Sequence, residues 1–165
     1  MSGTIVLGIG NRLGGDDAAG TLVVDMLKRA LRTRSSGPQT TEGFVSAEIT
    51  AIDASTTPES YTSIVRKDQP DLLILVDAAD MGLPPGALRT IPPGKVRTLS
   101  FSTHSMPLST LISYVEEFCG KVFLLGIQPE QTETGAPISE VVRKSAGKLT
   151  RAILEGRVAE IPQLR

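Results

Sequence analysis

Acidic side chains and a single histidine are the residues of this chain best suited to chemistry. Asp16 and Asp17 follow the first apolar segment and a glycine turn, Asp53 ends the second apolar segment, and Asp77 ends the third. His104, the only histidine, stands in the run Ser-Thr-His-Ser. Two carboxylates and one imidazole that converge would suit a divalent ion such as nickel, zinc or manganese, and would leave positions on it open. The residue types therefore indicate a metal-contacting site.

Each of these side chains also has a purely structural explanation. Asp16 and Asp17 could be an N-cap and a first-turn acid, a role worth about 1 kcal/mol. Asp77 could cap the turn after its strand, and a lone histidine is more often a hydrogen-bonded structural residue than a ligand. A helix beginning at Pro107 would favour coordination, because its positive N-terminus would help to keep the ring of His104 neutral. The joint position of these residues favours a site more than any one of them does.

The elements that must position these residues alternate between strand and helix. Apolar runs predict strands at 4–9, 45–52, 72–76, 87–91 and 122–127, and helical periodicity predicts helices from about 16 to 32, at 58–65, from 107 onward and at 138–154, with an exposed loop at 33–44. Such alternation implies a mostly parallel, twisted sheet with helices on both faces. We expect a single α/β domain over residues 1–165. In such sheets, sites gather at the carboxyl ends of the strands, where the acids stand.

Composition excludes several classes of protein. The 165 residues are 40% hydrophobic and 21% charged, as in a globular chain, and the net charge of −1 argues against a nucleic-acid surface. No apolar run is long enough to span a bilayer, and no signal for export is apparent. Cys119 is the only cysteine, so we expect no internal disulfide and a small buried residue within a helix pattern. These features predict a cytoplasmic protein, and a monomer is the default expectation.

The glycine turn has a competing interpretation as a dinucleotide-binding loop. The run Gly8-Ile-Gly-Asn-Arg-Leu-Gly14 is one residue longer than the usual fingerprint, and the next strand-end acid, Asp53, comes too late. Asp16 and Asp17 would also stand where a pyrophosphate has to bind, and would repel it. The glycines are better interpreted as a tight turn that exposes acids.

Four stretches of the chain resemble the nickel–iron hydrogenase maturation endopeptidases, most closely the branch that processes the large subunit of formate-hydrogenlyase-type hydrogenases. They occur in that family's order and at its spacing: 7–20 (LGIGNRLGGDDAAG), 75–86 (LVDAADMGLPPG), 102–108 (STHSMPL) and 124–129 (LLGIQP). The resemblance implies a twisted sheet flanked by helices. It also implies an endopeptidase that removes a short C-terminal extension from the large-subunit precursor after nickel insertion.

The same resemblance implies roles for individual residues. The family's metal-contact positions match Asp17, Asp77 and His104, which would recognise nickel held by the precursor, so the enzyme would have no tightly bound metal of its own. Where the family usually has Asp-Gly-Gly-Thr, this chain has Asp53-Ala-Ser-Thr. The acid is kept, but both glycines are lost, which puts the backbone freedom expected there in doubt.

Several mechanistic alternatives stay open at this point. The nickel could polarise the scissile carbonyl or a water molecule, and either Asp17 or Asp53 could be the general base. Gly10, Asn11 and Gln128 are candidates for binding the substrate, although Gln128 could equally be a plain turn residue. No nucleophilic serine or cysteine stands out. A protein that only docks on the precursor would use the same ligands, and only turnover separates the two functions.

Overall fold

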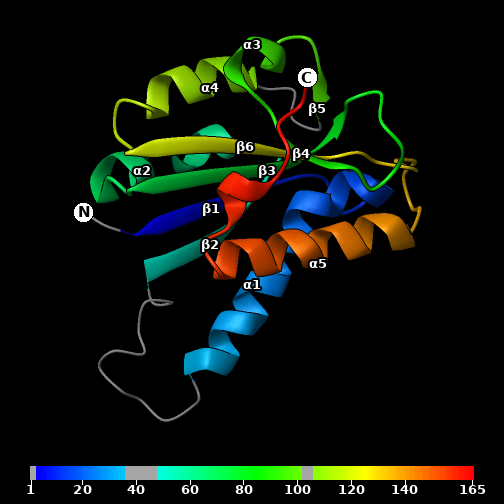
Figure 1. Ribbon diagram of the computed structural model, residues 1–165, viewed down its shortest axis with the longest axis horizontal. Coiled ribbons are helices and arrows are strands. Elements are labelled where there is room, and N and C mark those ends of the chain that lie inside the picture. Colours follow the sequence, from blue (N-terminus) through cyan, green and yellow to red (C-terminus); the bar gives the residue numbers. More distant parts are fainter. Residues whose placement is uncertain (1–2, 36–47, 102–105) are drawn as a thin grey trace.

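The computed structural model describes residues 3–35, 48–101 and 106–165 (Figure 1). Its strands, helices and 3-10 helices follow in the order β1 (Thr4–Ile9), η1 (Gly15–Ala18), α1 (Ala19–Ser35), β2 (Ile49–Ser55), η3 (Pro58–Tyr61), α2 (Thr62–Asp68), β3 (Leu72–Asp80), β4 (Leu88–Thr90), α3 (Pro93–Val96), β5 (Ser100–Phe101), α4 (Leu108–Val115), β6 (Lys121–Ile127), α5 (Glu140–Leu154) and η4 (Val158–Glu160).

The strands form one mostly parallel sheet, as predicted. Its order is β2-β1-β3-β6-β4, with β5 paired to the end of β3. Strands β2, β1, β3 and β6 run parallel to one another, while β4 and β5 are antiparallel to their neighbours. The carboxyl ends of β1, β3 and β6 therefore meet at one edge of the sheet, which we call the carboxyl edge.

Helices cover both faces of the sheet, and strand alternation explains why. Along β1, Ile5, Leu7 and Ile9 belong to one buried cluster, whereas Val6 belongs to another. The first cluster is closed by α2, α3 and α4, and the second is closed by α1 and α5 (Figure 1). Because both faces are buried, these strands need apolar residues at nearly every position, and this is the origin of the continuous apolar runs in the sequence.

Two glycines let α1 approach the sheet at backbone distance. A Cβ on Gly20 would lie 2.3 Å from the carbonyl oxygens of both Ile9 and Val76. A Cβ on Gly8 would lie 2.2 Å from the carbonyl oxygen of Gly20. No side chain fits at either position, so the start of α1 lies directly against β1 and β3 beside the carboxyl edge.

The structure corrects the predicted ends of several elements. Helix α1 continues to Ser35, so the predicted loop at 33–44 begins inside a helix, and residues 36–47 lie outside the described part of the chain. Strand β2 begins at Ile49 and ends at Ser55, and β3 continues to Asp80. Asp53 and Asp77 therefore lie within strands and do not end them. Past Val76, Asp77 and Ala78 pair with β6, and Ala79 and Asp80 pair with β5, and local sequence reveals neither pairing.

The region around α4 also differs from the prediction. Pro107 is the residue that precedes α4, and the helix ends at Val115. Cys119 consequently lies in the turn before β6, half-buried, and not within a helix. In the same turn, Gly120 lies against Asp71, where a Cβ would come within 2.5 Å of the Asp71 carbonyl oxygen. Desolvation raises the pKa of the Cys119 thiol.

Candidate active site

Asp17 and Asp77 lie at the carboxyl edge, on two adjacent elements. Asp77 is fully buried in β3, opposite Gly126 of β6. Asp17 is half-buried on η1, which packs against β3. The structure thus brings both predicted carboxylates to one edge. His104, the third predicted ligand, lies outside the described residues, so its place in the site stays a prediction.

The glycine turn before η1 shapes the surroundings of Asp17. The main-chain carbonyl of Asp17 accepts a hydrogen bond from the Asn11 amide at 3.1 Å, and a Cβ on Gly10 would lie 2.2 Å from that carbonyl oxygen. A Cβ on Gly14 would lie 3.3 Å from Oδ2 of Asp17. Glycine at position 14 therefore keeps space open beside the carboxylate. The predicted substrate-binding role of Gly10 and Asn11 is untested, but both residues hold this turn in place.

The amides of this turn are occupied within the protein. Gly10 donates to the carbonyl oxygen of Ser55 at 2.8 Å, and Gly14 donates to that of Asn11 at 3.1 Å. Leu13 donates to the side-chain oxygen of Asn11 at 2.9 Å. A phosphate cradle needs amides that point at the ligand. The turn is therefore built to present acids, and the dinucleotide interpretation has no structural support here.

Asp16 and Asp17 are neighbours that differ in burial. Asp16 is fully buried and accepts hydrogen bonds from the amides of Glu130, Gln131 and Ser139 at 2.8, 3.0 and 2.7 Å, and from the Ser139 hydroxyl at 2.8 Å. Burial opposes ionisation of Asp16, but these hydrogen bonds outweigh it and lower its pKa. The suggested N-cap role is wrong, because no side chain caps η1. Asp16 instead ties η1 to the loop before α5.

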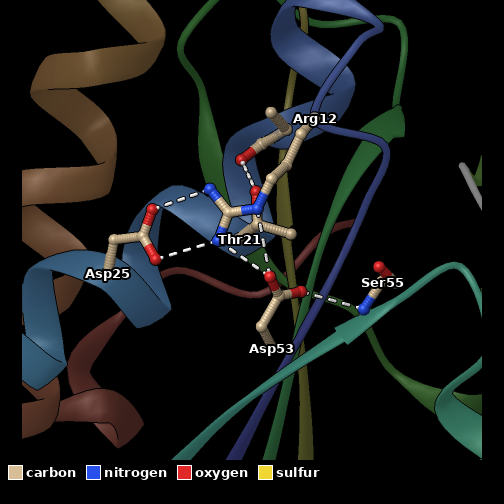
Figure 2. A network of polar contacts seen from close by, with 6 residues as sticks. Arg12, Thr21, Asp25, Asp53 and Ser55 are labelled. Carbon is tan, nitrogen blue, oxygen red and sulfur yellow. Dashed lines mark hydrogen bonds and ion pairs between the residues drawn. The ribbon is translucent and has the colours of Figure 1, made fainter.

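Asp53 belongs to an ion-pair network centred on Arg12, which Figure 2 shows between α1 and β2. The Arg12 guanidinium donates to both carboxylate oxygens of Asp25 at 2.9 Å, and to Oδ2 of Asp53 at 2.7 and 3.1 Å. Hydrogen bonds from Arg12 lower the pKa of Asp25, and the two carboxylates together raise the pKa of Arg12. The network fastens the glycine turn to α1 on one side and to β2 on the other.

The backbone after Asp53 adopts a conformation typical of glycine, although this chain has Ser55 there. Ser55 adopts a left-handed conformation, with φ of 51°. Its amide donates to Oδ1 of Asp53 at 2.9 Å, and its carbonyl accepts from the Gly10 amide at 2.8 Å. A serine thus occupies the backbone conformation that glycine favours, at a cost of about 1–2 kcal/mol. The local bonds to Asp53 and Gly10 offset this strain.

Gln128 lies buried at the end of β6 and bonds to the segment that follows β3. Its side-chain oxygen accepts hydrogen bonds from the amides of Met81 and Leu83 at 2.6 and 3.3 Å, and its side-chain nitrogen donates to Asp80 at 3.2 Å. These contacts hold the loop beside Asp77. A role in binding the substrate backbone stays a prediction.

Arg12, Asp25 and Ser139 are the residues of this region that sequence reasoning missed. Their partners are distant in the chain, since Arg12 and Asp53 are 41 residues apart and Asp16 and Ser139 are 123 apart. The one available signal was a lone cation in a turn rich in acids. No local pattern identifies Asp25, which otherwise looks like an ordinary polar residue of an amphipathic helix.

Within residues 3–35, 48–101 and 106–165, no group of three or more His, Cys, Asp or Glu side chains is arranged to hold a metal ion. A three-ligand site at the carboxyl edge would therefore need a side chain from the residues that the structure does not describe, and His104 is among those residues. In the same ranges, no helix is long and apolar enough to cross a bilayer.

Comparison with known proteins gives consistent matches over nearly the whole chain. The family model described as hydrogenase maturation protease matches residues 23–156. A putative hydrogenase maturation protease of Methanocaldococcus jannaschii is 33% identical over 92% of this chain and 86% of its own length. The hydrogenase 3 maturation protease of Escherichia coli K12 is also 33% identical, over 92% of this chain and 88% of its own length.

Solved structures of similar proteins share the fold. A crystal structure of the hydrogenase 3 maturation protease superposes with a TM-score of 0.80 at 30% identity, covering 99% of this chain and 97% of the other. The crystal structure of a nickel–iron hydrogenase maturation protease from Thermococcus kodakarensis superposes with a TM-score of 0.75 at 31% identity, covering 94% and 92%. The arrangement of sheet and helices described above is therefore also that of these proteases.

Proposed function

The chain belongs to the hydrogenase maturation protease family, and from this premise we propose that it removes a C-terminal extension from the large-subunit precursor of a nickel–iron hydrogenase after nickel insertion. Membership of the family makes it a hydrolase. The observation that supports the finer proposal is the pair of carboxylates at the carboxyl edge, Asp17 on η1 and Asp77 on β3.

We propose that Asp17, Asp77 and His104 contact the nickel that the precursor carries. Carboxylate and imidazole groups suit such an ion, which belongs to the substrate and leaves with the product. A precursor without nickel would bring no positive charge to the two carboxylates, so its complex would lack this attraction. The site would thus discriminate between metallated and unmetallated precursors through a difference in affinity.

The ion-pair network favours Asp17 over Asp53 as the general base. Both carboxylate oxygens of Asp53 already accept hydrogen bonds, from the Arg12 guanidinium and from the Ser55 amide. Position 14 is a glycine, so it places no side chain against Oδ2 of Asp17. In this proposal the substrate's nickel polarises the scissile carbonyl or the attacking water, and Asp17 accepts the proton of that water. Asp53 then acts by holding Arg12.

Intact mass spectrometry of a nickel-loaded large-subunit precursor, incubated with this protein, tests the proposed activity. We expect the precursor to lose the mass of one C-terminal peptide, with multiple turnovers per molecule of protein. A complex that forms while the precursor's mass stays unchanged would contradict the proposal and would identify a docking protein.

Location and assembly are further parts of the proposal. We propose a cytoplasmic monomer that meets its precursor before the hydrogenase is assembled. The single cysteine, Cys119, is compatible with a reducing compartment, because the fold needs no disulfide. Size-exclusion chromatography with light scattering measures the mass in solution, and a stable dimer would contradict the monomer.

A further inference from the structure

A polar cavity lies away from Asp17 and Asp77, between α5 and the edge strand β4. Its volume is about 420 Å³. Its walls come from three parts of the chain: β4 with the residues before it, the second half of α5, and the C-terminal segment from Arg157 through η4 to Pro162. Figure 1 shows that last segment, in red, running past β4 toward the C-terminus. We call this cavity the basic groove.

The charges around the basic groove are unbalanced. Four cationic side chains line it, Arg89, Lys148, Arg151 and Arg157, and one acid, Glu160. The chain as a whole has a net charge of −1, so this concentration does not reflect general basicity. Such a cavity raises the local concentration of anionic groups.

Three of these cations have no acidic partner among the residues that the structure describes. Arg157 pairs with Glu155 and, at 3.5 Å, with Glu160. No ion pair of the described residues includes Arg89, Lys148 or Arg151. Arg89 donates one hydrogen bond, to the carbonyl oxygen of Leu88, which keeps its guanidinium at the wall of the groove.

The helix dipole explains only part of this arrangement. Cations near a helix C-terminus are stabilised by its partial negative charge, which accounts for Arg151 and in part for Lys148. Arg89 is on β4, where no such dipole acts. Two unrelated elements therefore direct unpaired cations into one cavity, and the three charges repel one another unless an anion lies between them.

The shape and position of the groove indicate an extended occupant. It follows α5 from Ser145 to Ala152, which is about 10 Å, or about three residues of extended chain. At its near end, the Gly86 amide donates to the carbonyl oxygen of Gln128 at 2.8 Å. Gln128 follows directly after β6, whose Gly126 lies opposite Asp77. The near end of the groove is thus next in the fold to the end of β6 that lies beside Asp77.

We propose that the basic groove binds an acidic segment of the protein substrate, outside the residues at the carboxyl edge. This proposal rests on the proposed function, since it names a second contact with the same precursor. Side-chain carboxylates of that segment would pair with Lys148 and Arg151 on one wall and with Arg89 on the other. The contact would contribute affinity and association rate, and would leave the chemical step unchanged.

Direct binding of a labelled peptide tests the groove without any cleavage. The probe is fluorescein-labelled hexaglutamate, with labelled hexaglutamine as the uncharged control, and the readout is fluorescence anisotropy at low ionic strength. We expect hexaglutamate alone to bind, and added salt to weaken it. The double variant Lys148→Gln/Arg151→Gln should bind it about tenfold more weakly, a value typical of two exposed charge pairs. Arg89→Gln, on the other wall, should act in the same direction.

Arg143→Gln/Lys144→Gln is the matched control. It removes two exposed cations from the same helix, neither of which lines the groove. We expect its affinity for hexaglutamate to stay within about twofold of the wild type. Equal weakening by the control and the groove variant would overturn the proposal in favour of diffuse attraction to α5. Inorganic phosphate is the second control. If phosphate binds tightly to the protein and displaces hexaglutamate at the same low concentration, the proposal is overturned in favour of a small-anion site.

Processing of the precursor supplies the second readout. The groove variant Lys148→Gln/Arg151→Gln should raise KM about tenfold and leave kcat unchanged, while the control pair should change neither. If the wild-type protein cleaves the precursor and the groove variant has the same KM, the groove proposal alone is overturned. A wild-type protein that binds hexaglutamate in the groove but cleaves nothing would instead contradict the proposed protease activity.

Discussion

At the scale of single residues, adjacent or similar acids have different tasks because their partners differ. Asp16 is buried under four hydrogen bonds, and Asp53 is held by Arg12 and Ser55. Asp17 is half-buried beside a glycine that leaves room at its carboxylate. Sequence alone predicted that acids gather here, but Asp16 and Asp17 are chemically identical neighbours. Only the direction of η1, and a loop more than a hundred residues away, decides which of the two turns inward.

Substitution of Asp16 by asparagine should destabilise the fold in a pH-dependent way. Ionised Asp16 has a pKa below its ordinary 3.8, so its contribution is present above that value and is lost as the pH falls through the lowered pKa. Asp16→Asn should therefore lower the free energy of unfolding by about 2–3 kcal/mol at neutral pH, because it turns an NH₂ toward amide donors. Urea unfolding at pH 7 and pH 3 measures both values. A difference from wild type that is equally large at pH 3 would contradict this assignment.

Gly14→Ala tests the space beside Asp17 while the charge stays in place. The new methyl group would lie 3.3 Å from Oδ2 of Asp17 and would crowd any ion or water placed there. We expect precursor cleavage to slow at least tenfold, while the melting temperature changes little, because Gly14 has an ordinary negative φ. Cleavage kinetics and thermal unfolding are measured on the same sample. Unchanged cleavage would remove the argument for Asp17 as a ligand or base.

Arg12→Gln tests whether the ion-pair network positions the site. Arg12 is about half-exposed, and exposed ion pairs contribute only about 0.2–1 kcal/mol, so stability should fall slightly. The cleavage rate should fall by more than the small loss of stability explains, because the turn before η1 loses its side-chain bonds to Asp53 and keeps only the backbone bond from Gly10 to Ser55 of β2. Asp25→Asn is the control, since it leaves the bonds between Arg12 and Asp53 intact. If both variants cleave the precursor at the wild-type rate, the network is a surface feature only.

At the scale of elements, most of the fold could be predicted because β1, β3 and β6 are buried on both faces. Their continuous apolar runs identified them, and the parallel order that follows placed the acids at one edge. The extension of β3 to Asp80 could not be predicted, since it depends on distant partners, β6 for Asp77 and Ala78 and the two-residue strand β5 for Ala79 and Asp80. The conformation of Ser55 could not be predicted either, because serine rarely adopts a left-handed backbone and local residues do not require it.

Two glycine-to-alanine changes on helices should have opposite effects on stability. Gly20→Ala forces a methyl group to within 2.3 Å of two backbone carbonyl oxygens, and overpacking of this kind costs about 1–3 kcal/mol or more. Gly147 of α5 has no atom within 4 Å of a built Cβ, so Gly147→Ala should stabilise the protein by about 0.5–1 kcal/mol through helix propensity. Denaturant unfolding of both variants measures the difference. A Gly20→Ala protein as stable as wild type would show that α1 does not need this close approach.

At the scale of the whole molecule, we propose that the carboxylates at the carboxyl edge of this small sheet bind a metal that another protein carries. The family, the fold and the approach of Asp17 and Asp77 to one edge agree with what the sequence predicted. The recognition of nickel and the part of His104 are still predictions. Both depend on contacts with the precursor, and those contacts cannot be read from the sequence or structure of this protein alone.

The most direct test of this account compares nickel-loaded and nickel-free precursor under otherwise identical conditions. Each is incubated with wild-type protein and with His104→Ala, and the intact mass of the precursor is followed over time. The account predicts loss of one C-terminal peptide in the nickel-loaded wild-type reaction and in none of the other three, with His104→Ala still folded by circular dichroism. Equal cleavage of the nickel-free precursor by the wild-type protein would contradict it, because the carboxylates and the imidazole would then have no metal to recognise.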